Sequence, residues 1–78
     1  MNKNLIEQSS AAACKKLNLP WSVFEIFPGS RNQILIHFRS ENDEMFEVSF
    51  DDSSRLLTLD DYSRLIEERL PTAVKLPA

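Results

Sequence analysis

The chain has 78 residues, of which 42% are hydrophobic and 27% charged, a balance typical of one folded domain rather than a disordered segment. Its net charge of −3 argues against a nucleic-acid ligand, because such binding normally needs a concentrated basic surface. The single cysteine, Cys14, excludes an internal disulfide, so we expect a reducing, cytoplasmic environment.

The N-terminal segment predicts a helix over residues 4–17. Asn4 followed by Glu7 has the spacing of a capping box. Asn18 suits a left-handed C-cap, and Pro20 prevents the helix from continuing. The face expected to be buried carries small or apolar residues at helical spacing, namely Ile6, Ser9, Ser10, Ala13 and Leu17.

Three strands follow, over residues 21–27, 33–39 and 44–50, each rich in aromatic and β-branched residues. A three-residue turn over residues 41–43 places the apolar residues of the second hairpin on one face, as a half-buried sheet requires. This register pairs Phe38 with Phe46, Ile36 with Val48 and Ile34 with Phe50.

For the first hairpin, regular alternation that puts Phe24 and Ile26 on the apolar face fixes the other pairs. These expected pairs are Trp21 with Arg39, Val23 with His37 and Glu25 with Leu35.

A second helix is predicted to begin after Thr58, with Asp60 and Asp61 at the positive end of its dipole, and to end at Pro71. Its apolar stripe consists of Leu59, Tyr62, Ile66 and Leu70.

The sequence thus predicts one α+β domain over residues 1–71. We expect a two-layer α-β-β-β-α fold, in which a three-stranded antiparallel meander carries both helices on one face. Leu56 and Leu57 are expected to pack under the sheet edge, and residues 72–78 to form an extended C-terminal tail.

This order of elements resembles that of double-stranded RNA-binding domains. That family contacts RNA through basic residues at the start of its second helix, where this chain has Asp60 and Asp61. The resemblance therefore concerns the order of elements and implies no RNA-binding residues.

The sheet face turned away from the helices is the candidate functional surface. Arg39 is expected over the Trp21 indole as a cation–π pair, and His37 opposite Glu47. We expect a non-enzymatic protein-binding module, an adaptor or inhibitor, whose partner is another protein or a second copy of the chain. Its proposed contact residues are types enriched in protein interfaces: Trp21, Val23, Phe27, Leu35, His37, Arg39 and Met45.

Other functions have weaker support. A catalytic His37 lacks a nucleophile elbow or a glycine-rich turn, so no enzyme activity is predicted. One cysteine and one histidine cannot make a structural zinc site, and no cofactor, small-molecule ligand or membrane association is predicted. The alternative is an acidic mimic of nucleic acid that blocks a nucleic-acid-binding protein, using acids such as Asp51 and Asp52. Interleaved arginines argue against it, and caps, turns and solvated faces explain most of these acids.

Overall fold

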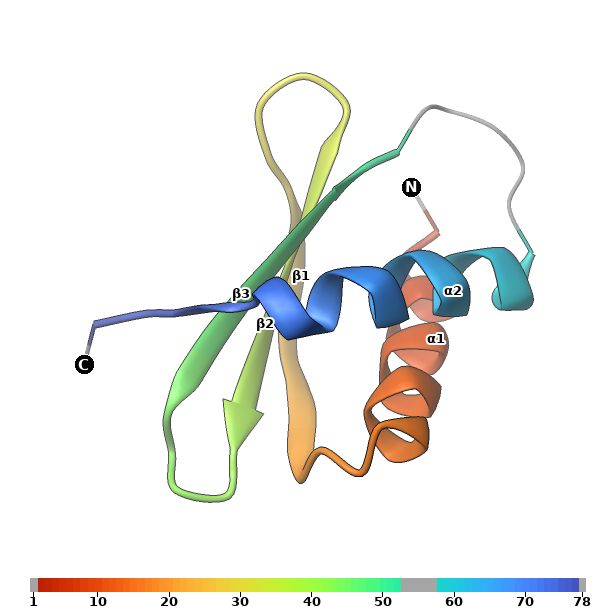
Figure 1. The fold of residues 1–78 in the computed structure, drawn as a ribbon. Coiled ribbons are helices and arrows are strands. Elements are labelled where there is room, and N and C mark those ends of the chain that lie inside the picture. Colours follow the sequence, from red (N-terminus) through yellow and green to blue (C-terminus); the bar gives the residue numbers. More distant parts are fainter. Residues whose placement is uncertain (1, 53–57, 78) are drawn as a thin grey trace.

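A computed structural model describes residues 2–52 and 58–77 and shows two layers, with both helices on the same side of the sheet (Figure 1). The helices are α1 (Lys3–Lys16) and α2 (Leu59–Arg69). The antiparallel sheet has the order β1-β2-β3-β4, formed by Trp21–Pro28, Gln33–Ser40, Met45–Asp51 and Val74–Lys75. The predicted α+β fold is confirmed, while the short β4 is an addition to the predicted meander. Leu56 and Leu57 lie outside the described residues.

α1 begins earlier than the sequence predicts. The N-cap is Asn2, whose side-chain oxygen accepts a hydrogen bond from the Leu5 N–H at 3.1 Å. The Ile6 N–H also donates to the Asn2 carbonyl at 3.0 Å, so a start at Asn2 adds backbone bonds that a start at Asn4 forgoes. The predicted capping box at Asn4 is therefore wrong.

α1 ends as predicted, with Asn18 in the left-handed conformation at a φ of 57°. The Leu19 N–H donates to the Cys14 carbonyl at 2.8 Å, and the Asn18 N–H donates to the Lys15 carbonyl at 3.2 Å. These two bonds form a Schellman motif. As a result, the chain turns back sharply and places Leu19 beside the last turns of α1.

Small buried hydroxyls allow α1 to pack closely against α2. Ser9 and Ser10 are fully buried, and their hydroxyls donate to the Leu5 and Ile6 carbonyls, each at 2.7 Å. The Ser9 hydroxyl also lies 3.3 Å from the Leu59 carbonyl of α2. The polar groups are thus satisfied without water at the helix–helix contact.

α2 begins with the predicted N-cap. The Asp61 N–H donates to Thr58 Oγ1 at 3.2 Å, and the Thr58 N–H donates to Asp61 Oδ2 at 3.1 Å, which completes a capping box. The prediction that Leu17 and Leu59 are buried in the apolar stripes of the two helices is wrong. They are 42% and 40% exposed, because each lies at a helix end. Pro71 stops the α-helix as predicted and lies in a 3-10 turn, η1 (Leu70–Thr72).

The hairpin of β2 and β3 has the predicted register and turn. Asp43 has a φ of 61°, and the Ser40 N–H donates to the Glu44 carbonyl at 2.8 Å across the turn. The observed pairs include Phe38–Phe46, Ile36–Val48 and Ile34–Phe50. The six residues of these three pairs therefore face the helices.

β1 departs from prediction because it contains a β-bulge at Phe24. The pairs are Trp21–Ser40 and Val23–Phe38 before the bulge and Glu25–His37, Ile26–Ile36 and Phe27–Leu35 after it. The extra residue turns Trp21 and Val23 toward the core, where Ile26 also lies, and leaves Phe24 54% exposed. Three large apolar side chains of β1 thus reach the core, instead of the two that regular alternation would bury.

The expected pairing of this hairpin is therefore wrong at each predicted pair, namely Trp21–Arg39, Val23–His37 and Glu25–Leu35.

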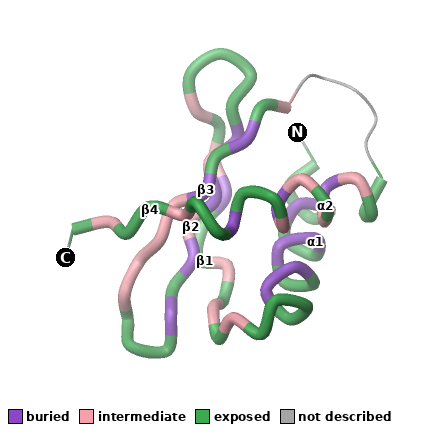
Figure 2. Tube along the Cα trace, in the orientation of Figure 1, coloured by how far each residue is buried: buried purple, intermediate pink, exposed green. Residues whose placement is uncertain are grey.

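The core lies between the helices and the inner face of the sheet, where the buried segments of both layers face each other (Figure 2). Ile36 and Phe38 of the central strand β2 are fully buried, as are Ile6 of α1 and Ile66 of α2. Neither of the two described helices lies over the opposite face of the sheet (Figure 1).

Within the segment predicted to be extended, Val74–Lys75 form the edge strand β4. Val74 pairs with Glu47, Lys75 pairs with Phe46, and the Leu76 N–H donates to the Met45 carbonyl at 2.8 Å. Val74 consequently joins the uncovered face of the sheet, on the same side as Glu47.

Candidate protein-binding surface

The face of the sheet that carries no helix is the candidate functional surface. β2 and β3 place side chains on it in rows, because Arg39 pairs with Met45 and Leu35 pairs with Ser49. The bulge in β1 keeps Glu25 and Phe27 on this face, beside the next rows of β2. We use the term outer surface for the following residues of this face: Glu25, Phe27, Leu35, His37, Arg39, Met45, Glu47 and Val74.

His37 lies at the middle of the outer surface and is held by two neighbours. Its Nε2 atom lies 2.9 Å from Glu47 Oε2, and the Phe27 ring meets the imidazole edge-on at 4.8 Å between centroids. The His37 side chain is only 18% exposed, and Glu25 lies opposite it on β1. A carboxylate on each side therefore gives the middle of the surface an acidic character.

Apolar side chains border this acidic row on two sides. Phe27 and Leu35 form the neighbouring row toward one end of the strands, and both are half-buried. Met45 is also half-buried, and Val74, on the edge strand, is 61% exposed. The outer surface thus combines a charged centre with partly exposed apolar borders.

Two of the predicted contact residues, Trp21 and Val23, lie on the other face, so their predicted placement is wrong. The Trp21 ring stacks on Phe46 at 4.4 Å and lies 5.8 Å from Phe38, and Val23 packs against the core. The physical reason is the bulge, which shifts both residues to the helix side of the sheet.

The remaining predicted residues, Phe27, Leu35, His37, Arg39 and Met45, are brought together on the outer surface.

Arg39 makes its cation–π contact with a different ring from the one predicted. Its guanidinium carbon lies 5.0 Å from the centroid of Phe24, and its Nε atom lies 3.9 Å from Asp43 Oδ1. The sequence does contain a signal for this arrangement, because adjacent apolar residues at 23–24 break the alternation expected of a regular strand. No sequence pattern of this kind predicts that Val74 lies on the outer surface, because its position depends on how the C-terminal segment pairs with β3.

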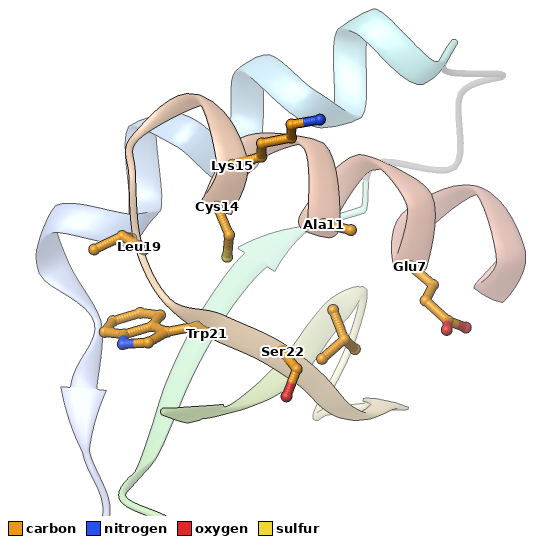
Figure 3. A pocket seen from close by; sticks show the side chains of 8 residues that line it. Glu7, Ala11, Cys14, Lys15, Leu19, Trp21 and Ser22 are labelled. Carbon is orange, nitrogen blue, oxygen red and sulfur yellow. The ribbon is translucent and has the colours of Figure 1, made fainter. Parts of the chain in front are cut away.

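A second feature is an open groove of about 480 Å³ between α1 and β1 (Figure 3). Among the described strands, β1 pairs with β2 alone, so the groove runs along the other edge of β1. Figure 3 shows Leu19 and Trp21 toward one end and Glu7 toward the other. The groove is lined by Glu7, Ala11, Cys14, Lys15, Leu19, Trp21, Ser22 and Val23.

Cys14 points from α1 toward β1 in this groove (Figure 3). Burial raises the pKa of the Cys14 thiol to about 11, so the thiol is neutral near pH 7 and is a poor nucleophile there. Its position favours a packing role in the wall of the groove.

The sequence matches no protein-family model, and comparisons with curated proteins and with solved structures give no match either. Within residues 2–52 and 58–77, no three His, Cys, Asp or Glu side chains are grouped as metal ligands would be. Neither of the two helices described here has the length and apolar character needed to cross a membrane.

Proposed function

We propose that the protein is a binding module that attaches to another protein through the outer surface, as an adaptor or inhibitor, in the cytoplasm. The observation that carries the proposal is the clustering of Phe27, Leu35 and Met45 around the His37–Glu47 pair on a sheet face with no helix over it. Such side chains stabilise a complex when a partner removes them from water.

The charges of the outer surface indicate the chemistry of the partner. Glu25 and Glu47 flank His37, and Arg39 is already engaged with Phe24 and Asp43. A partner segment with apolar side chains and a lysine or arginine between them matches this pattern, because it covers the apolar borders and neutralises the acidic row. The chain as a whole, with its net charge of −3, favours the approach of such a basic segment.

Binding explains His37 better than catalysis does. The imidazole contacts Glu47 and Phe27, and His37 lines none of the three hollows along α1. A catalytic base needs room for a substrate within hydrogen-bonding reach. Here the same contacts instead orient His37 as part of a surface.

Mimicry of nucleic acid has less support, because several acidic groups have local partners. Glu67 lies 3.1 Å from Lys16, Glu44 is paired with Lys75, and Asp61 caps α2. Acids neutralised within the protein present fewer charges to a basic cleft. The two proposals differ in their salt dependence, since a complex built on mimicry weakens steeply as salt is added.

Site-specific photocrosslinking tests the proposal in the native host. Benzoylphenylalanine replaces Leu35 on the outer surface or, as a matched control, Leu17 at the end of α1, which is 42% exposed. We expect a discrete protein adduct from position 35 that position 17 does not give. The same adduct from both positions, or none from position 35, would count against the outer surface.

The captured protein is then purified and its affinity measured. We expect Leu35→Ser combined with Met45→Ser to weaken binding by about tenfold or more, while Leu17→Ser leaves it unchanged. Equal affinities for the unchanged protein, the Leu35→Ser/Met45→Ser variant and the Leu17→Ser variant would refute the proposed surface. Circular dichroism verifies that each variant is folded.

A further inference from the structure

We infer that the groove between α1 and β1 is the interface of a two-fold symmetric homodimer, in which α1 and β1 of one copy meet α1 and β1 of a second copy in antiparallel orientation. The inference concerns the α1 side of β1, which meets the outer surface at Glu25, and it does not rest on the proposed function. Three features of the groove are self-complementary under this symmetry.

The charges on α1 are arranged for an antiparallel pair of copies. Glu7, Ala11 and Lys15 are four residues apart and therefore lie along one face of the helix, which borders the groove. Rotation about an axis near Ala11 brings Glu7 of each copy to Lys15 of the other. Within one copy Glu7 and Lys15 are about 12 Å apart along the helix, too far to pair with each other.

Ala11 lies at the centre of this arrangement. It is exposed, and its small side chain permits two helices to approach closely at the crossing point. The short connection after α1 also makes β1 run antiparallel to α1, so the two elements share the same centre.

The two ends of the groove differ in the residues that line them. At one end, Leu19 and Trp21 lie beside Cys14 and form an apolar hollow (Figure 3). At the other end, a second hollow of about 310 Å³ includes Phe24, the exposed aromatic residue of the bulge, with Lys3 and Glu25. The same two-fold rotation places Phe24 of one copy at the apolar hollow of the other.

A second copy of the chain fits this surface. It offers an apolar hollow to the exposed Phe24, and it places Lys15 opposite Glu7. A dimer of this kind also covers the free edge of β1, which otherwise offers unpaired backbone groups to solvent. Apart from Glu25, no residue of the outer surface lines either hollow, so the dimer presents two outer surfaces.

Sedimentation equilibrium of the full chain, from low micromolar to near millimolar concentration, tests the inference. We expect the mass to rise from 9.0 kDa toward twice that value. Glu7→Lys alone and Lys15→Glu alone each replace two attractive pairs by two like-charged pairs, which weakens the dimer by about tenfold or more. Glu68→Lys makes the same charge change on α2 and is the matched control, expected to dimerise like the unchanged protein.

Mixing the two single variants gives the sharpest result. In the mixed dimer, each lysine at position 7 or 15 of one copy meets a glutamate of the other, so we expect the mixture to recover the dimer that neither variant forms alone. Phe24→Ser removes the aromatic residue without changing any charge and weakens the dimer independently.

Trp21, the only tryptophan, reports directly on the groove. Its emission is expected to shift to shorter wavelength with concentration in the unchanged protein and not in Glu7→Lys. A protein that stays at 9.0 kDa throughout, or single variants that self-associate as tightly as the unchanged chain, overturns the inference.

Discussion

Replacing Trp21 should destabilise the fold much more than replacing Phe24, although both are aromatic residues of one strand. Full burial of a tryptophan removes roughly 150–250 Å² from water, or ~4–6 kcal/mol at ~25 cal/mol per Å². Trp21 keeps part of its surface exposed, so we expect Trp21→Ala to lower the free energy of unfolding by about 3 kcal/mol. Phe24 is 54% exposed and lies under Arg39, so Phe24→Ala should cost only about 1 kcal/mol.

The assay is urea denaturation followed by far-ultraviolet circular dichroism, because Trp21→Ala removes the fluorophore. Low micromolar protein keeps any self-association out of the comparison. A domain of 78 residues is expected to have a free energy of unfolding of ~4–12 kcal/mol, so a difference of about 2 kcal/mol between the variants is easily resolved. If Phe24→Ala proves the more costly change, the bulge and the core placement of Trp21 are both refuted.

Two further predictions concern titratable groups. Hydrogen bonds from the backbone and side chain of Thr58 lower the pKa of Asp61, so its ionised form stabilises the fold above the ordinary carboxyl pKa, and this contribution is lost as pH falls through the lowered value. Asp61→Asn should therefore be less stable than the unchanged protein at pH 7 and equal to it in strong acid; an undiminished difference in acid would contradict this. The Cys14 thiol, with its pKa raised to about 11 by burial, should react with iodoacetamide far more slowly at pH 8 in the folded protein than in urea, and equal rates would show that it is accessible.

The parts of the fold that the sequence predicts are those fixed by interactions between near neighbours. Asp43 suits the left-handed position of a three-residue turn, and that turn alone determines the register of β2 with β3. Thr58 and Asp61 are three residues apart and satisfy each other's backbone groups, so the start of α2 is equally local. In both cases few alternatives compete with the observed arrangement.

The errors arise where two local solutions have similar support and packing decides between them. Asn2 and Asn4 are both suitable N-caps, and the helix that starts at Asn2 gains backbone hydrogen bonds. In β1, regular alternation buries Phe24 and Ile26, while the bulge buries Trp21, Val23 and Ile26. Adjacent Val23 and Phe24 mark a break in the alternation, but which side chains are buried depends on the space beneath α1 and beside Phe46, outside β1 itself.

Most of the predicted outer surface is retained because the bulge affects only the first half of β1. Leu35, His37, Arg39 and Met45 owe their orientation to the turn between β2 and β3, which the bulge does not affect.

After the bulge β1 has the same facing that regular alternation would give, and so Phe27 also stays on the outer surface. The bulge therefore changes only the first half of β1: it moves Trp21 and Val23 into the core and exposes Phe24 at the free edge. The proposed partner binding at the outer surface and the proposed self-association along α1 thus depend mostly on different residues. Substitutions away from Phe24 and Glu25, where the two surfaces meet, are expected to affect one of them and leave the other intact.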